Sequence, residues 1–195
     1  YPDLSKSTKH LPHGMLRLPT GKMSSRTGDV ITAEDLIKDV SAKVKDSEPL
    51  SIAAIKYMIL RQSIGNDIVF DFDKSVSTEG DSGVYLEYAH ARATSVLDKA
   101  DKKWSIKGER AETHEIERLL YRLPEIVERA GEDYSPQFVT TYLTELASSF
   151  NNFYAHEQVN SDSPETPYRL AIVEAFKVVM KNGLTILGIP VLDRV

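Results

Sequence analysis

From residue 36 onward, apolar residues recur every three or four positions, and this spacing restricts the fold more than any other feature of the chain. A period of about 3.6 residues puts apolar side chains on one face of an α-helix, whereas a half-buried strand alternates every second residue. The pattern predicts helices at residues 32–44, 50–62, 84–103, 113–130, 136–154 and 169–182. Because almost no strand is expected between them, the sequence predicts an all-α helical bundle.

Capping residues predict where several of these helices begin and end. Thr32 can accept hydrogen bonds from the free amides of the first helix, and Ser135 followed by Pro136 suits the start of another. Pro124 predicts a bend or a restart within residues 113–130. Gly183 is expected to end the last helix, because glycine readily adopts the left-handed conformation that closes a helix.

Two helices carry aromatic side chains on one face. In the helix at 84–103, Tyr85, Tyr88 and Arg92 share a stripe. The helix at 136–154 has a longer stripe, which we expect to be core because aromatic stripes are mostly buried. Its members are Phe138, Tyr142, Leu146, Phe150, Phe153 and Tyr154.

The segments outside the helical pattern are expected to be irregular. Residues 1–30 hold three prolines and three glycines with short apolar runs between them, which predicts loop and short strand. Residues 63–83 are expected to be a connection with a short strand or a helical turn. The bundle is therefore predicted to follow an irregular lead.

Composition excludes several classes of protein. The 195 residues, 41% of them hydrophobic and 27% charged, suit one ordinary globular domain with a short appendage. No apolar run reaches the roughly 18 residues that a membrane-spanning helix requires. The absence of cysteine excludes disulfides, thiolate nucleophiles and cysteine-bound zinc, and it fits a reducing cytoplasm. No leader segment is recognised and the chain begins with Tyr1, so we expect a processed chain or a fragment.

Charge is distributed unevenly over a chain whose net charge is -5. Residues 1–30 carry five Lys and Arg against two Asp and Glu, and residues 83–110 carry six against four. Each stretch could meet phosphates, although charge alone favours a solvated face.

The densest polar cluster is the segment Gly21–Asp29, which combines two glycines, two cations and three hydroxyls. Such a loop can bend close to a polyanion, with amides and hydroxyls as donors and Lys22 as the charge. It is not a P-loop, because six residues separate Gly14 from Gly21 where a P-loop has four, and Met23 occupies the position of the magnesium-binding hydroxyl. Phosphate is the ligand that these residue types favour.

The segment Lys22-Met23-Ser24-Ser25 resembles the Lys-Met-Ser-Lys loop of class I aminoacyl-tRNA synthetases. Six segments, in order, resemble the arginyl-tRNA synthetases of this class and cover nearly the whole chain. They are residues 13–16, 21–29, 70–74, 85–92, 146–154 and 187–189.

The resemblance implies a C-terminal piece of such an enzyme. Residues 1–35 would be the end of the catalytic domain with the signature loop, and residues 36–195 a helical bundle of the class I anticodon-binding type. Most of the active site would lie outside this chain, so we expect the fragment to be inactive by itself and to have no bound cofactor. The remainder of the catalytic domain would be its partner within the longer chain.

The resemblance also assigns the loop a role in arginyl-adenylate formation from arginine and ATP with magnesium. Lys22 would stabilise the charge that builds on the departing pyrophosphate, and Ser24 and Ser25 would donate hydrogen bonds. Met23 would lie against the ATP phosphates with its neighbours. Ser25 departs from the pattern, because the wider class has a second lysine there.

The helical part would bind the anticodon of arginine tRNA. Splayed bases pack on aromatic or apolar side chains while cations hold the RNA backbone. The candidate residues are Tyr85, Tyr88, Arg92, Lys99, Lys102 and Lys103. The residues alone leave core packing and RNA contact about equal for the tyrosines, and the resemblance favours contact.

Three alternatives complete the sequence-based expectations. His10 and His13 lack a third ligand, so no metal site is predicted, and His114 and His156 are expected at the surface.

The chain could instead be a helical protein-interaction domain with synthetase ancestry, or an independent phosphate-binding enzyme. We expect a monomer without membrane attachment.

Overall fold

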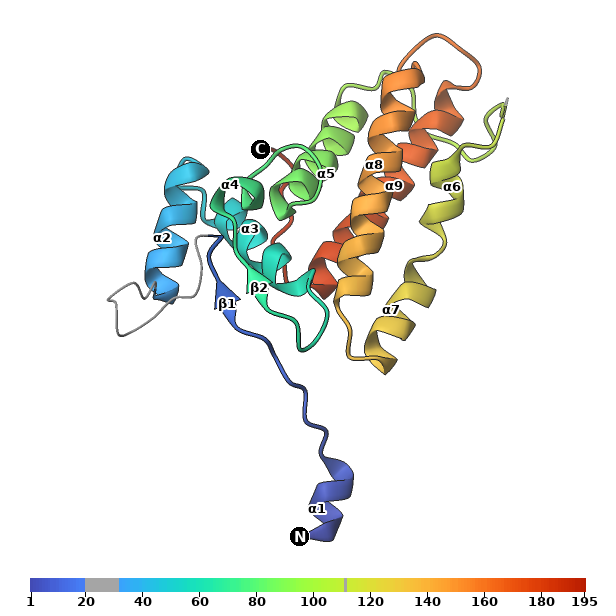
Figure 1. Cartoon of the computed structure of the whole chain (residues 1–195). Helices are drawn as coiled ribbons and strands as arrows, with labels where there is room; N and C mark the ends of the chain where they lie inside the picture. Colours follow the sequence, from blue (N-terminus) through green and yellow to red (C-terminus); the bar gives the residue numbers. More distant parts are fainter. Residues whose placement is uncertain (20–31, 111) are drawn as a thin grey trace.

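The computed structural model describes residues 1–19, 32–110 and 112–195, and it is mostly helical (Figure 1). Its elements in chain order are α1 (Pro2–Ser7), β1 (Leu16–Arg17), α2 (Ala33–Lys43), α3 (Glu48–Leu60), β2 (Ile68–Val69), α4 (Phe72–Ser75), α5 (Gly83–Asp98), α6 (Glu115–Leu120), α7 (Leu123–Glu132), α8 (Gln137–His156) and α9 (Thr166–Ile186). The predicted all-α class is confirmed, and within the described ranges strand is limited to two residue pairs.

The long helices α5, α8 and α9 pack against one another, and α3 closes the bundle on the other side of α5 (Figure 1). Their shared core contains Leu86, Leu146, Phe150 and Phe176, none of which is exposed to solvent. The rings of Phe150 and Phe176 stack with their centroids 3.9 Å apart and 7° between their planes. Burial of this apolar surface is the main favourable term in the stability of the bundle.

Helices α6 and α7 flank α8 and confirm the restart predicted at Pro124. Pro124 occupies one of the first two positions of α7, where its missing amide hydrogen costs nothing. Tyr142 on α8 donates a hydrogen bond to the Leu119 carbonyl over 2.9 Å, and burial raises the pKa of its hydroxyl to about 12. This bond ties α6 to α8 inside the core.

A second, smaller core joins α2, α3 and α4, with Val40 and Phe70 completely buried. The lead meets this part of the fold through a parallel pairing of β1 with β2, in which Leu16 lies opposite Ile68. Gly14 is required beside it, because a β-carbon there would approach the Asn66 carbonyl oxygen to 2.0 Å. In Figure 1 the short helix α1, which the sequence did not predict, lies away from the bundle at the end of an extended segment.

Capping was predicted correctly at one end of the fold and wrongly at the other. Thr32 caps α2 as expected, and its side chain and that of Asp35 form a capping box. Gly183, however, lies inside α9 against Leu143, where a β-carbon would come within 2.5 Å. The helix ends instead at Ile186 with Leu187 as its C-cap, and Gly188, whose φ is 65°, closes it in a Schellman motif through the bond from the Ile189 amide to the Leu184 carbonyl.

One predicted cap is wrong and one predicted turn is present. Ser135 makes no side-chain cap, since α8 begins at Gln137 with Pro136 at its N-cap. Asp71 begins the short helix α4 by accepting two amide hydrogens, which agrees with the helical turn expected within residues 63–83.

Among the described residues, no helix combines the length and the low polarity needed to cross a bilayer.

Candidate nucleic-acid interface

The aromatic stripe of α5 begins where the chain turns from the loop after α4 into the helix. The Ser82 hydroxyl accepts a hydrogen bond from the Tyr85 amide over 2.9 Å and so caps the helix. Gly83 lets this end of α5 approach α3, because a β-carbon there would lie 2.0 Å from the Ala53 carbonyl oxygen. The cap and the close approach fix the register that turns Tyr85 and Tyr88 toward α8.

A side-chain amide on α8 links two of the predicted residues. Asn151 donates to the Tyr85 hydroxyl over 2.9 Å, and its oxygen accepts a hydrogen bond from the Arg92 guanidinium over 2.5 Å. The guanidinium carbon also lies 5.9 Å from the centre of the Tyr154 ring, within the range of a cation–π contact. Arg92 is therefore held in place by the facing helix.

An open groove of about 1140 Å³ runs beside these residues. Its lining comes from α5, from the end of α8 with the following loop, and from the last residues of the chain. Tyr88 and Tyr154 contribute from α5 and α8, and their exposed fractions are 38% and 42%. Two half-exposed phenol rings that share a groove with an arginine are suited to stack on unpaired bases while the cation meets a phosphate.

The charges in the groove are mixed, but its acidic groups have partners. Asp98 lies 4.0 Å from Arg194, Glu157 pairs with Arg169 at 2.7 Å, and Asp193 lies 3.8 Å from a lysine of α9. Within residues 32–110 and 112–195, Lys99 takes part in no ion pair. Arg92 and Lys99 are therefore the groove cations that pair with no carboxylate among the described residues.

The structure divides the predicted cations between two places. Because α5 ends at Asp98 and not near residue 103, Lys99 stays in the groove as the C-cap of the helix. Lys102 and Lys103 lie beyond it in a separate hollow of about 600 Å³, together with the exposed ring of Trp104. Lys102 is also engaged there, since it donates to the Ser163 carbonyl over 3.4 Å.

The predicted phosphate-binding loop cannot be placed relative to this groove. Lys22, Met23, Ser24 and Ser25 all lie outside the described residues. Their assignment rests on the sequence alone.

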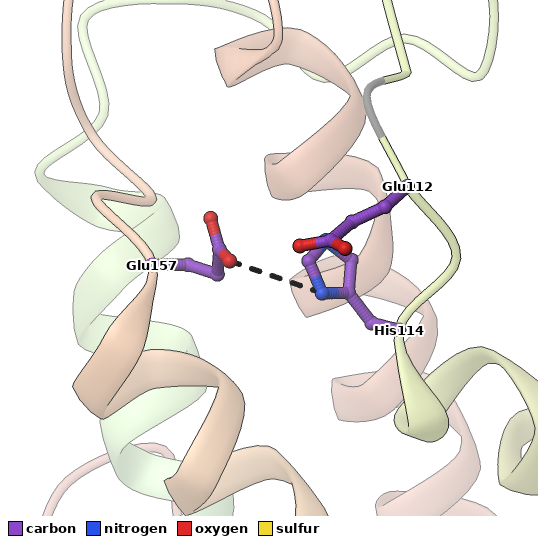
Figure 2. Close-up of side chains that lie close together, drawn as sticks. All are labelled: Glu112, His114 and Glu157. Atoms are coloured by element: carbon purple, nitrogen blue, oxygen red, sulfur yellow. Dashed lines mark ion pairs between the residues drawn. The ribbon is translucent and has the colours of Figure 1, made fainter.

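A cluster at the start of α6 has ligand types that metals use. Figure 2 shows Glu112, His114 and Glu157, whose potential ligand atoms lie within 4.8 Å of one another. His114 is not at the open surface as expected: its side chain is 17% exposed and packs edge-on against the Phe153 ring. Arg169 already binds the Glu157 carboxylate and would repel a cation, so we interpret the cluster as an ion-pair network.

Sequence reasoning missed two residues of the interface. The sequence assigns Asn151 no role beyond its place in the resembling segment 146–154, and it predicts Tyr154 in the core with the rest of its stripe. No signal in the sequence separates Tyr154 from Phe153, because adjacent residues of α8 such as Tyr142 and Leu143 are both buried.

The chain is similar to known proteins over most of its length. Residues 86–195 match the family model described as the DALR anticodon binding domain. A curated relative from Lactococcus lactis subsp. cremoris, named arginine–tRNA ligase, is 34% identical over 96% of this chain. A relative of the same name from Streptococcus pneumoniae is 33% identical over the same share.

Solved structures show the same fold at lower identity. The arginyl-tRNA synthetase of Thermus thermophilus aligns over 100% of this chain with a TM-score of 0.86 and 23% identity. That of Plasmodium falciparum aligns over 99% with a TM-score of 0.78 and 20% identity. The chain spans 37% of the Lactococcus relative and 37% of the Thermus chain, so it corresponds to only a part of each. Since the family model covers more than half of its residues, the chain belongs to the DALR anticodon binding domain family.

Proposed function

We propose that this chain is the C-terminal, tRNA-binding part of an arginine–tRNA ligase, and that it binds the anticodon of arginine tRNA in the groove between α5 and α8. The single observation that carries the proposal is that two half-exposed rings, Tyr88 and Tyr154, line one groove together with Arg92. The family membership and the relatives named arginine–tRNA ligase support the choice of RNA and of amino acid.

The groove suits single-stranded RNA better than a duplex. Stacking of a base on an aromatic ring contributes about 1–3 kcal/mol, and it requires a base that has left its helix. Anticodon bases meet this condition because they lie in a loop. Arg92 and Lys99 would then meet the backbone, which predicts binding that weakens as salt increases.

In the longer enzyme, residues 1–35 would complete the catalytic domain and residues 36–195 would form the anticodon-binding domain. Lys22, with Met23, Ser24 and Ser25, would bind the ATP phosphates, with magnesium as the counter-ion. A cation that binds the departing pyrophosphate more tightly than it binds ATP would accelerate arginyl-adenylate formation. We propose a monomer in the cytoplasm.

The test is a binding titration with arginine tRNA transcripts and this chain. We expect affinity to fall when the central anticodon cytosine is changed and to fall again with added salt. Tyr88→Ala should weaken binding about tenfold, the loss of one stacked base. Tyr121→Ala is the matched control, because Tyr121 is 75% exposed and lies outside the groove.

The alternative, a helical protein-interaction domain without an RNA role, makes the opposite prediction. It predicts equal, weak binding of every anticodon variant and no difference between the two tyrosine variants. That result would reject the proposed function.

A further inference from the structure

The last residues of the chain are held against α5 by two buried ionisable side chains. The Leu192 amide donates to Glu87 Oε2 over 2.9 Å, and the Leu192 carbonyl oxygen lies 2.9 Å from His90 Nδ1. Glu87 and His90 are three residues apart on one face of α5, so together they bind both polar groups of a single residue. Neither side chain is exposed to solvent.

Each of these side chains also keeps one polar atom without a partner in the described part of the chain. The atoms are Glu87 Oε1 and His90 Nε2. An unsatisfied buried polar atom costs about 1–3 kcal/mol, which an apolar pair at these positions would avoid. Packing alone therefore does not explain why two ionisable residues lie here, whereas their hydrogen bonds to Leu192 do.

Further contacts continue the attachment toward the groove. Thr94 on α5 donates to Asp193 Oδ1 over 3.4 Å, and Lys177 on α9 lies 3.8 Å from the same oxygen. Asp193 and the following residues, Arg194 and Val195, line the groove together with Tyr88 and Arg92. The segment after Leu192 therefore forms one wall of the groove, and the position of that wall depends on the Leu192 attachment.

We propose that Glu87 and His90 are positioning residues that fix the wall formed by residues 193–195 and thereby set the shape of the RNA-binding groove. This inference rests on the proposed function only for the identity of the ligand. Neither side chain touches the groove itself, since neither is among its lining residues. Both would act through the Leu192 peptide groups.

The protonation states follow from what each side chain faces. His90 must donate from Nδ1 to a carbonyl oxygen, so its neutral form carries the proton there. Burial lowers the pKa of His90 and keeps it neutral, while Asp193 opposes this shift and the α9 cations Lys177 and Lys181 assist it. Burial raises the pKa of Glu87 to about 7, and the hydrogen bond from the Leu192 amide opposes the rise.

The first experiment measures hydrogen exchange of residues 189–195 and RNA affinity in the same set of variants. Glu87→Leu and His90→Leu remove the bonds to Leu192, whereas Glu87→Gln and His90→Asn keep an acceptor and a donor. We expect the leucine variants to raise exchange and to weaken RNA binding about tenfold, and the conservative variants to restore both. Thr140→Val on α8 is the control for a buried polar change away from the groove.

A second variant keeps the proposal testable if the α5 leucine variants fail to fold. Leu192→Pro removes the amide hydrogen that bonds to Glu87, and it lies outside every helix. We expect this variant both to raise the exchange of residues 193–195 and to weaken RNA binding. Faster exchange with unchanged RNA affinity would overturn the proposal while the proposed function stands. If the unaltered chain binds no RNA, the proposed function fails, and the exchange data still decide whether the pair holds the segment.

Discussion

Asn151 on α8 accepts a hydrogen bond from Arg92 on α5 over 2.5 Å, so the cation expected to meet RNA is oriented by the opposite side of the interface. The same amide donates to the Tyr85 hydroxyl over 2.9 Å. The uncharged amide of Asn151 thus positions both the cation of Arg92 and the aromatic side chain of Tyr85.

Replacement of Asn151 by alanine should therefore weaken RNA binding without removing any group that touches RNA. Loss of the bond frees Arg92 to adopt other rotamers, and we expect affinity to fall about three- to tenfold, as for one hydrogen bond. Asn152→Ala is the matched control, since this neighbouring amide is exposed and lies outside the groove. Equal affinities for the two variants would show that Arg92 needs no orientation.

The pH dependence of stability should carry the signature of Glu87. Its pKa rises from 4.5 in the unfolded chain to about 7 in the folded one, because burial disfavours the carboxylate. The folded chain therefore holds a proton that the unfolded chain has lost, and its stability falls as pH rises through this window, by about 3 kcal/mol in all. The lowered pKa of His90 acts oppositely, removing stability as pH falls below 6.5.

Urea denaturation of the unaltered chain and of Glu87→Gln between about pH 5 and pH 8 measures this effect. The amide cannot ionise, so its stability relative to the unaltered chain should increase with pH up to about 7 and then stay constant. Parallel curves would mean that Glu87 does not titrate in this window.

Gly83 is expected to tolerate no side chain. A β-carbon would lie 2.0 Å from the Ala53 carbonyl oxygen and 3.0 Å from the Tyr57 β-carbon, and backbone of a packed helix cannot move aside. Gly83→Ala should lower the free energy of unfolding by about 2–3 kcal/mol, the usual cost of overpacking. Gly131→Ala is the control, because nothing lies within 4 Å of its β-carbon position, and it should be neutral or slightly stabilising.

In the longer enzyme, substitutions in the two proposed regions should separate two steps. Lys22→Ala should slow arginyl-adenylate formation about 100-fold, the loss of one charge-stabilising group, with little change in tRNA affinity. Tyr88→Ala should do the reverse. Pyrophosphate exchange and tRNA binding, measured on both variants, decide the matter, and unchanged exchange with Lys22→Ala would refute the loop assignment.

The helices could be predicted because the signals for a helix are local. Apolar spacing identified each long helix, and Thr32 and Pro124 marked two of the ends correctly. The same signals failed where the outcome depended on a neighbour. Ile37 shares the helical apolar pattern of its segment but is 52% exposed, and Gly183 continues a helix because Leu143 packs against it.

The candidate site divides in the same way. Tyr88 and Arg92 were selected from the sequence, and the structure places both at one groove. The groove also needs Tyr154 from α8, and nothing in the spacing of α8 tells which ring of its stripe faces outward. The loop of Lys22 remains a prediction from sequence.

By itself, the amino-acid sequence determined the helices, the capping of α2 and the stripe of α5, because periodicity and hydrogen-bonding side chains act over a few residues. Only the tertiary structure decided that Leu192 returns to Glu87 across 105 residues and that Asn151 meets Arg92 across 59. Such contacts form when separate apolar faces pack together and bring distant polar groups within bonding distance. No local pattern records that arrangement, because it belongs to the assembled core.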